Sequence, residues 1–434
     1  MTTADLTQRD YYTDQSLLLD PYEYFRQMYA KGPVTSMGDS DVLLVTGFDE
    51  VVEVLRNNKD FSSLITTSGT GEAPPFEPVG SDVSEQIEAS REPLGERNLL
   101  VTYDDKPHSD MRFIAGRLFT PTRLKSTHDF MYEFADQLVL EAVRNGGCEL
   151  VNGIATPFVT MVIAELLGVP PQDRDKFRAV IDAAPPPGNM GKDEEPQVSP
   201  LVYMAGFFFE YLNDRRENPT EDVLTQLALA TYPDGTLPDL LEMVKLAGFL
   251  FGAGQDTSAK LLSNAMRHIV EVPGLQQQLR ADHSLIPAML EEVLRLEGST
   301  KVTFRIARRD TQIGAIKIPA GTRLMLSLAA ANRDPRRWEN PEEFRLNRPR
   351  IKEHLAFGRG VHTCAGAPLA RVEVKAILER FLAHTTHISL SEAKHGTPGN
   401  RRLDYEPSFI IRGLANLHLD LESSLNKKYT AGGF

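Results

Sequence analysis

The sequence predicts a mainly α-helical protein with a small β portion. Helical spacing of apolar residues dominates residues 107–168, and a longer helical pattern extends from Pro238 to about Glu271. Strand-like segments are short by comparison, such as residues 42–46 near the N-terminus. We therefore expect helices to form most of the core, with a small sheet beside them.

Composition indicates a soluble globular protein. Apolar residues make up 41% of the chain and charged residues 25%, and the formal net charge of −13 is a poor match for nucleic acid or an anionic membrane. The first 15 residues contain neither a signal-peptide core nor a membrane anchor. Only Cys148 and Cys364 occur, neither in a CxxC pair, so we expect no disulfide framework and a cytoplasmic location.

The N-terminal half alternates regular and irregular segments. Residues 21–55 combine a short amphipathic helix with strand-like pieces. Residues 62–106 are rich in Gly, Pro, Ser and Glu and too long for a simple connection, which predicts a functional loop or lid, or else a mobile surface insertion. Pro107 suits a first helical turn, and Gly168 followed by Pro170 suits a helix end.

The second half contains the longest helix. An irregular segment at 185–200 precedes a helix with three aromatic residues at 207–209, and the pattern from Pro238 to Glu271 predicts about 45 Å of helix. More helix follows to Leu296, then strand-like segments around residues 303, 313 and 324, and a loose tail at 426–434. Length alone permits two or three domains, but the motif spacing favours a single domain over 1–434.

A glycine-bearing run from Phe357 to Gly366 contains Cys364 and leads directly into helical sequence. Glycines such as Gly358 permit backbone bends that turn amide groups toward the sulfur, and Phe357 can cover it. The positive end of the following helix favours an ionised sulfur. Two alternatives are a buried cysteine in a turn and a phosphate loop, although the third glycine of such a loop is replaced by Thr363.

This run resembles the cysteine loop of the cytochrome P-450 family, with Ala365 at a commonly variable slot. The resemblance implies that Cys364 is the axial ligand of the iron of haem b, and that the haem lies between the long helix and the cysteine loop in a cytochrome P-450 fold. Motifs that match the family occur in family order from residue 108 to residue 411.

The long helix contains two glycines, Gly252 and Gly254, beside Ala253, Asp256 and Thr257. Each glycine inside a helix costs about 1 kcal/mol relative to alanine, so the two need an explanation. One explanation is close packing against a neighbouring helix. The other is room for a flat cofactor and a diatomic ligand, with the helix opening locally at Thr257. The resemblance implies that Asp256 and Thr257 form the acid and alcohol pair that delivers protons during oxygen activation.

The family resemblance also implies two charged clusters. Glu292 and Arg295 could form an ordinary exposed pair, but the resemblance makes them a buried structural pair joined by Arg348. A second set carries cations or donors for the haem propionates, namely His108, Arg112, Arg305 and His362.

The substrate pocket is the least specific prediction, because each candidate could equally belong to the core. Apolar character favours a hydrophobic small molecule such as a terpenoid, a steroid or a fatty acid. By family position, the candidates are Phe249, Leu250, Ala253, Val302, Thr303, Phe409 and Ile410.

The resemblance implies hydroxylation with O2, and the electrons must come from another protein because the chain has no flavin or iron–sulfur pattern. We expect a ferredoxin and a ferredoxin reductase, which deliver electrons from NAD(P)H. A peroxide-driven peroxygenase and a non-catalytic haem sensor are the alternatives. The surface expected to dock an acidic ferredoxin comprises Arg112, Arg117, Arg359, Arg371 and Lys375.

Overall fold

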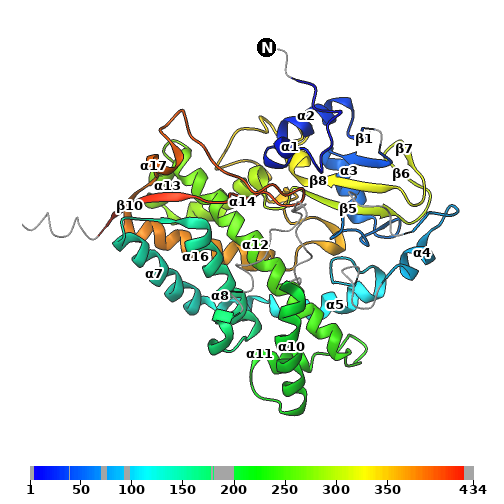
Figure 1. Ribbon diagram of the computed structural model, residues 1–434, viewed down its shortest axis with the longest axis horizontal. Helices are drawn as coiled ribbons and strands as arrows, with labels where there is room; N and C mark the ends of the chain where they lie inside the picture. Colours follow the sequence, from blue (N-terminus) through cyan, green and yellow to red (C-terminus); the bar gives the residue numbers. More distant parts are fainter. Residues whose placement is uncertain are drawn as a thin grey trace, which may run out of the picture.

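The structure is a computed structural model that describes residues 4–38, 40–69, 76–91, 98–176, 179 and 200–424. Apart from residue 200, the irregular segment predicted at 185–200 lies outside the described residues, as does the tail predicted at 426–434. Helices form most of the molecule, and a sheet occupies one side of it (Figure 1). This arrangement confirms the predicted fold class.

Sixteen α-helices are present in the described residues. They are α1 (Gln15–Leu19), α2 (Tyr22–Lys31), α3 (Phe48–Arg56), α4 (Ser84–Ala89), α5 (Asp105–Leu118), α6 (Pro121–Ser126), α7 (His128–Arg144), α8 (Thr156–Leu167), α10 (Pro200–Glu217), α11 (Val223–Ala228), α12 (Leu240–Glu271), α13 (Leu275–Ala281), α14 (Ile286–Glu297), α15 (Leu328–Ala331), α16 (Ala367–His384) and α17 (Glu392–His395). None of these helices combines the length and apolar character that crossing a bilayer requires.

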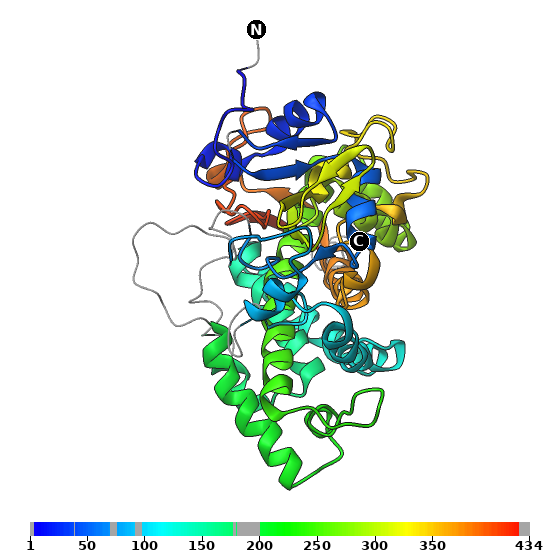
Figure 2. The same cartoon turned by 90° about the vertical axis from the view of Figure 1, so that its right-hand side faces the viewer.

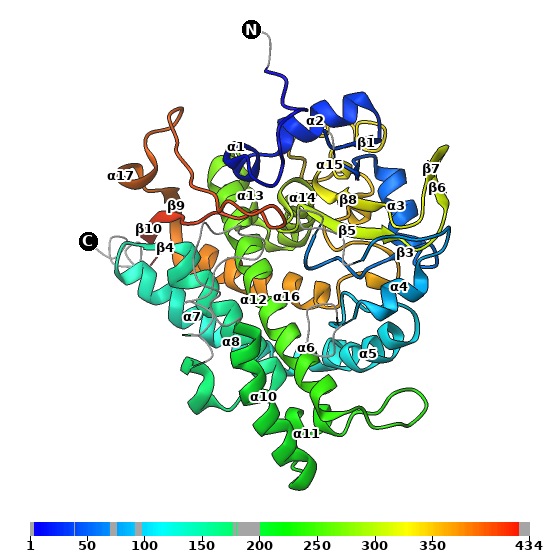
Figure 3. The same ribbon diagram turned by 45° about the vertical axis from the view of Figure 1, so that its right-hand side comes forward.

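The predicted long helix is α12, whose 32 residues correspond to about 48 Å. The Asp239 side chain accepts a hydrogen bond from the N–H of Leu241 at the start, and the extended residue Val272 before Pro273 ends the helix. The helix passes through the middle of the molecule and packs against α8, α10, α14 and α16 (Figures 2 and 3). A residue on α12 can therefore belong to several layers of the core.

Within the described residues, ten short strands form three sheets. The five-stranded sheet has the order β1-β2-β8-β5-β3, in which β2 and β8 are parallel and the other neighbours are antiparallel. The second sheet has the order β4-β10-β9, and β6 pairs with β7. The strands are β1 (Val34–Ser36), β2 (Val42–Val45), β3 (Phe61–Ser62), β4 (Gly147–Glu149), β5 (Val302–Ala307), β6 (Thr311–Ile313), β7 (Ile316–Ile318), β8 (Arg323–Ser327), β9 (Thr385–Leu390) and β10 (His418–Ser423).

The core consists of one large helical cluster and a smaller cluster on each face of the five-stranded sheet. On one face of the sheet, Phe304 and Met325 pack with residues of the N-terminal segment. On the other face, Leu324 and Leu326 pack against α3 and Trp338. Strand β5 therefore separates two environments, and consecutive residues along it point into different ones.

The segment predicted as a loop at 62–106 contains more regular structure than expected. It begins in β3, includes α4 and ends at the start of α5, while Asp82 forms a bridge with Arg309. Gly69 adopts the left-handed conformation at φ +72°, and a Cβ there would lie 3.0 Å from the ring of Phe409. This segment thus reaches a predicted substrate residue; its function as a lid stays a prediction.

Candidate active site

The loop before α16 folds back so that Cys364 lies beside Phe357. The Cys364 N–H donates to the carbonyl oxygen of Phe357 at 2.9 Å. Gly358 and Gly360 have φ angles of +67° and +74°, in the left-handed region that glycine tolerates. A Cβ on Gly360 would lie 2.3 Å from the backbone oxygen of Leu55, so this position admits only glycine.

The Cys364 sulfur receives the electrostatic environment that the sequence predicts, but burial opposes it. Burial raises the pKa of the Cys364 thiol, while the backbone N–H groups of Gly366 and Ala367 and the guanidinium of Arg112 act in the opposite direction. Burial outweighs them, so the loop alone does not favour the ionised sulfur. A coordinated metal ion deprotonates such a thiol outright.

Exposure argues against the alternative of an inert buried cysteine. Cys364 keeps an exposed surface although protein atoms surround it, whereas Cys148 is half-buried in β4. Burial raises the pKa of Cys148 to about 12, so this second thiol stays protonated near neutral pH. Of the two cysteines, Cys364 is therefore the one that a ligand can reach.

The four predicted propionate residues converge on Cys364 from three elements. His108 and Arg112 lie on α5, Arg305 lies on β5, and His362 belongs to the cysteine loop. The rings of His108 and His362 are 4.0 Å apart between centroids. Arg112 donates to the carbonyl oxygen of Thr363, and Arg305 donates to that of Phe304 at 2.6 Å.

These four residues form a basic cluster, a name kept below for His108, Arg112, Arg305 and His362. None of them forms an ion pair with an acidic residue in the described part of the chain. The acid that acts on His108 and Arg305 is Asp104, which instead pairs with Arg91 at 2.9 Å.

Burial and mutual repulsion lower the proton affinity of the basic cluster. Burial is the main reason that the pKa of His108 falls to about 4, that of His362 to about 2 and that of Arg305 to about 10. The Nε2 atom of His362 is buried without a hydrogen-bond partner among the described residues. Buried cations and donors in this state fit an anionic ligand such as the two carboxylates of haem b.

The middle of α12 presents a small exposed side chain between buried neighbours. Ala253 is exposed, while Phe251 and Gln255 on either side are buried. A Cβ on Gly254 would lie 3.5 Å from the Ile163 side chain, an ordinary contact, so packing against α8 does not require glycine there. This geometry favours the explanation that small residues leave room on this face of α12.

The local helix opening predicted at Thr257 is wrong, because α12 is continuous from Leu240 to Glu271. The Thr257 hydroxyl donates to the carbonyl oxygen of Ala253 at 2.9 Å, four residues earlier in the same helix. The Ser299 hydroxyl donates to the carbonyl oxygen of Thr257 at 2.7 Å. Side-chain hydroxyls therefore add to the hydrogen bonds of the helix without interrupting it.

Asp256 lies beside Thr257 and has one free carboxylate oxygen. Its Oδ1 atom is 3.6 Å from the Nζ atom of Lys260, and its Oδ2 atom is buried without a partner among the described residues. Burial raises the pKa of Asp256, and Lys260 opposes this effect. A carboxyl group with raised proton affinity next to a hydroxyl is suited to hold and pass a proton.

The predicted charge cluster of Glu292, Arg295 and Arg348 is brought together and is closed. Glu292 accepts bonds from Arg295 at 2.9 and 2.8 Å and from Arg348 at 2.8 and 3.0 Å. Both arginines also donate to backbone carbonyl oxygens, including those of Pro341 and Glu339. We call these three residues the closed cluster, because every charge in it has an opposite charge and further hydrogen bonds.

The substrate candidates divide into core residues and partly exposed residues. Leu250, Val302 and Phe409 are buried, and Phe409 packs edge-on against Phe304 at 6.1 Å between ring centroids. The candidates that keep some exposure are Phe249, Ala253, Thr303 and Ile410.

Strand alternation separates the adjacent candidates Val302 and Thr303. Thr303 lies on the same side of β5 as Arg305, and the two side chains approach to 3.4 Å. Val302 points to the opposite side, where it is fully buried in the core with Phe304. The structure therefore favours Thr303 over Val302 as a residue near the basic cluster.

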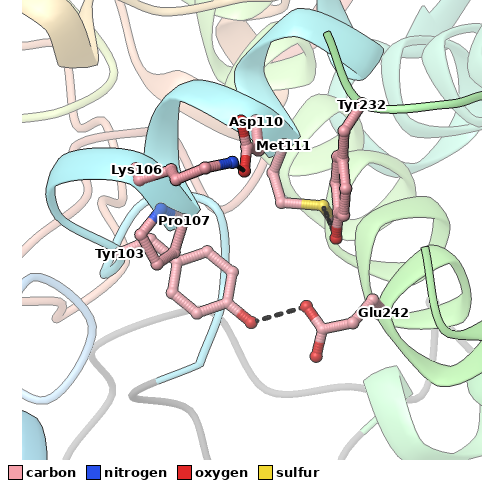
Figure 4. A pocket seen from close by; sticks show the side chains of 7 residues that line it. All are labelled: Tyr103, Lys106, Pro107, Asp110, Met111, Tyr232 and Glu242. Carbon is pink, nitrogen blue, oxygen red and sulfur yellow. Dashed lines mark hydrogen bonds and ion pairs between the residues drawn. The ribbon is translucent and has the colours of Figure 1, made fainter. Parts of the chain in front are cut away.

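A separate surface pocket of about 340 Å³ lies between the start of α5 and the start of α12 (Figure 4). None of the candidate site residues lines it. The Tyr103 hydroxyl donates to Glu242 at 2.8 Å, and Lys106 pairs with Asp110 at 2.5 Å, so its polar groups satisfy one another. Its lining residues are Tyr103, Lys106, Pro107, Asp110, Met111, Tyr232 and Glu242.

The cations predicted to dock a ferredoxin are not equivalent. Arg371 pairs with Glu291 at 2.5 Å and lies over the Phe357 ring, and Lys375 pairs with Glu379 at 2.8 Å. Arg117 is exposed and lies over the ring of Phe113. Arg112 belongs to the basic cluster and donates to Thr363, and Arg359 is half-buried and forms no ion pair with a described residue. Arg117 and Arg359 are therefore better placed than Arg112, Arg371 and Lys375 to receive a partner's acids.

Sequence reasoning missed the residues that support this site from distant segments. Glu291 pairs with Arg371 and is also hydrogen-bonded to His354, with 3.0 Å between its Oε2 atom and the Nε2 atom of the ring. No local sequence pattern reveals this link. Lys260 carried a usable signal, because it follows Asp256 by four residues on a helix. Its second partner, Glu406, lies in the segment between α17 and β10 and carries no such signal.

Comparisons with known proteins agree with this geometry. The family model described as cytochrome P450 matches residues 203–397. Cytochrome P450 144 of Mycobacterium tuberculosis is 32% identical over 93% of this chain and 89% of its own. The monooxygenase PikC of Streptomyces venezuelae is 31% identical over 93% of this chain and 91% of its own.

A solved structure extends the likeness to the whole fold. Cytochrome P450 CYP150A6 of Mycobacterium marinum, in its substrate-free form, is 43% identical, with a TM-score of 0.90 over 97% of this chain and 100% of that chain. Together with the sequence relatives, this match establishes both the fold and the enzyme class. The chain belongs to the cytochrome P450 family of haem-thiolate monooxygenases.

Proposed function

We propose that this P450 hydroxylates a hydrophobic small molecule with O2, using electrons that a ferredoxin and its reductase deliver from NAD(P)H. The observation that carries the proposal is the basic cluster, which is buried or half-buried beside the exposed Cys364 and has no acidic partner in the described part of the chain. When bound there, haem b supplies the iron at which O2 is reduced and one oxygen atom enters the substrate.

The residues of the cysteine loop and the basic cluster hold the haem in this proposal. Cys364 binds the iron, with Phe357, Gly358 and Gly366 around the sulfur, and the basic cluster binds the propionates. A carbon monoxide difference spectrum of the reduced protein tests the ligand, since thiolate ligation gives a diagnostic Soret band. Cys364→Ser should lose this band; if the variant kept it, another residue would be the ligand.

Asp256 and Thr257 control proton delivery in this proposal. Asp256 holds a proton at its free Oδ2 atom. The Thr257 hydroxyl, which is hydrogen-bonded to the carbonyl oxygen of Ala253, passes that proton on. Ala253 and Gly254 leave space for O2. Thr257→Ala should divert electrons to hydrogen peroxide, measured as product formed per NAD(P)H consumed. Unchanged coupling would contradict this role.

The partly exposed apolar candidates support a hydrophobic substrate bound mainly by burial. Phe249, Thr303 and Ile410 come from three separate elements and offer one hydroxyl. A panel of terpenoids, steroids and fatty acids added to the ferric enzyme tests the class, because a bound substrate changes the spin state of the iron. Only compounds that give this change and a product count as substrates.

The ferredoxin is proposed to dock at Arg117 and Arg359, near the cysteine loop. Arg56 also acts on Arg359, so like charges gather there. Electron transfer should therefore slow as salt is added, because screening weakens attraction between exposed charges. Rates that do not depend on salt would contradict an acidic partner at this surface.

Two alternatives are separated by one reconstitution experiment. A peroxygenase would form product with hydrogen peroxide and incorporate its oxygen, whereas the proposed enzyme needs reductant and incorporates oxygen from isotope-labelled O2. The Asp256 and Thr257 pair favours the proposed O2-dependent enzyme over a peroxygenase. A haem sensor would give no turnover with either. A single-domain organisation over 1–434 and a cytoplasmic location remain predictions, which limited proteolysis and cell fractionation test.

A further inference from the structure

Asp256 shares its cation with a second carboxylate. The Lys260 side chain, only 4% exposed, has its Nζ atom 3.6 Å from Oδ1 of Asp256 and in direct contact with Oε1 of Glu406. The second carboxylate oxygens, Oδ2 of Asp256 and Oε2 of Glu406, are buried and lack hydrogen-bond partners among the described residues. One buried ammonium group therefore serves two carboxyl groups.

The segment that carries Glu406 is folded tightly over Lys260. The Glu406 N–H donates to the carbonyl oxygen of Gly413 at 3.1 Å, and Tyr405 forms a β-bridge with Leu414. A Cβ on Gly413 would lie 2.0 Å from Cδ of Lys260. The absence of a side chain at Gly413 thus creates the path by which the lysine reaches Glu406.

We propose that Lys260 and Glu406 are positioning residues that set the proton occupancy of Asp256, because Asp256 and Glu406 compete for the ammonium group of Lys260. This inference rests on the proposed function of Asp256 in proton delivery. When the ammonium group stays with Glu406, Asp256 is held only weakly and keeps its proton at Oδ2. When the ammonium group moves to Asp256, it favours the ionised carboxylate and draws it away from Thr257.

The charges on neighbouring elements leave Lys260 as the main control. Burial raises the pKa of both Asp256 and Glu406, Lys260 lowers both, and Asp256 also raises that of Glu406. Three carboxyl groups on helices packed against α12 have other partners. Glu373 of α16 bonds to Ser258, Glu297 of α14 pairs with Arg267 and Arg412, and Glu165 of α8 pairs with Arg174.

The test measures the protonation midpoint of Asp256 in the ferric holoenzyme, from the infrared band of its protonated carboxyl group, with Asp256→Asn to assign the band. Lys260→Met should raise the midpoint and Glu406→Gln should lower it, each by about one pH unit. Shifts in the same direction, or no shift in either variant, would overturn the competition between the two carboxylates.

Gly413→Ala provides a second test if Lys260→Met does not retain haem. It keeps every charge but blocks the path of Lys260 to Glu406, so the ammonium group should move toward Asp256 and the midpoint should fall, by less than in Glu406→Gln; an unchanged or raised midpoint would overturn the proposed geometry. Lys260→Arg should stay close to the wild type. Coupling is measured separately: if Asp256→Asn leaves coupling unchanged, the proposed proton role fails while the midpoint shifts still decide the positioning role.

Discussion

The closed cluster is fully buried and the basic cluster is buried or half-buried, and both contain two arginines, yet they are built in opposite ways. In the closed cluster, Glu292 lies between Arg295 and Arg348, and carbonyl oxygens take up further donors. The basic cluster has no acidic partner within the described residues, and its His362 has a buried nitrogen without a hydrogen bond. One cluster is complete within the described residues, and the other is completed, in the proposed function, by the propionates of the haem.

This difference offers a way to tell structural charges from binding charges. A buried cation costs free energy unless an opposite charge or strong acceptors compensate it. Where the protein provides both, as at Arg295, the charge belongs to the fold. Where the protein provides neither an acid nor full hydrogen bonding, as around His362, the free-energy cost of the uncompensated polar groups is relieved when an anion binds. Four experiments test this distinction.

The largest effect is expected from breaking the closed cluster. Glu292→Ala leaves two buried arginines without their acid, so it should lower the free energy of unfolding by about 3–5 kcal/mol and reduce haem incorporation. Chemical denaturation and the haem content of purified protein measure both effects. The matched control is Glu23→Ala, which breaks the exposed Glu23–Arg26 pair at the same spacing and should change neither.

A smaller effect, of different kind, is expected from the basic cluster. Arg305→Met should weaken haem binding by roughly 10- to 100-fold, because a hydrogen bond to a charged group contributes about 1.5–3 kcal/mol. The free energy of unfolding of the apoprotein should not fall, since no acid loses its partner. Arg295→Met is the comparison and should destabilise the apoprotein. If Arg305→Met destabilised it equally, Arg305 would be structural.

Protonation should distinguish the two forms of the basic cluster. The pKa of His108 is about 4 in the folded protein, below the ordinary value of 6.5. The unfolded chain therefore binds the proton first, and His108 alone should lower the stability of the apoprotein by about 1.5 kcal/mol as the pH falls from 6.5 to 5. His108→Asn should reduce this loss. Haem should reduce it too, because propionates favour the protonated imidazole; equal pH dependence with and without haem would argue against this contact.

The smallest effect concerns the exposed cations. Arg359→Glu should slow electron transfer from a ferredoxin severalfold at low salt, whereas Lys375→Glu should slow it less, because Lys375 already pairs with Glu379 at 2.8 Å. Stopped-flow reduction at several salt concentrations measures the difference. Equal effects of the two variants would show that only net charge matters. If neither variant changed the rate, the ferredoxin would dock at a different surface.

Local sequence signals predicted much of the fold and of the site. The pattern from Pro238 to about Glu271 predicted α12, and Gly168 ends α8 in the left-handed conformation, as expected. The spacing of His108 and Arg112 placed both on one side of α5. These predictions succeed because caps, glycine conformations and helical periods depend on residues close together in the chain.

The contacts that the sequence did not reveal have a different origin. Arg371 was expected at the docking surface, and its acidic partner, Glu291, lies 80 residues away in the sequence. The partner of Lys260, Glu406, is 146 residues away, and the path between them exists only because Gly413 packs there. The choice between Val302 and Thr303 was within reach, since the alternation along β5 and the position of Arg305 determine which residue faces the site.

The side-chain alternation of β5 has a consequence for selectivity. Thr303 and Arg305 are two residues apart on one side of the strand, a spacing of about 6.6 Å, and pairing with Leu326 and Leu324 fixes it. The strand thus fixes the distance between the proposed propionate-binding residue, Arg305, and the residue proposed to contact the substrate, Thr303. The carbon of the substrate that is oxidised should therefore change with the side-chain volume of residue 303, because the strand backbone does not move to compensate.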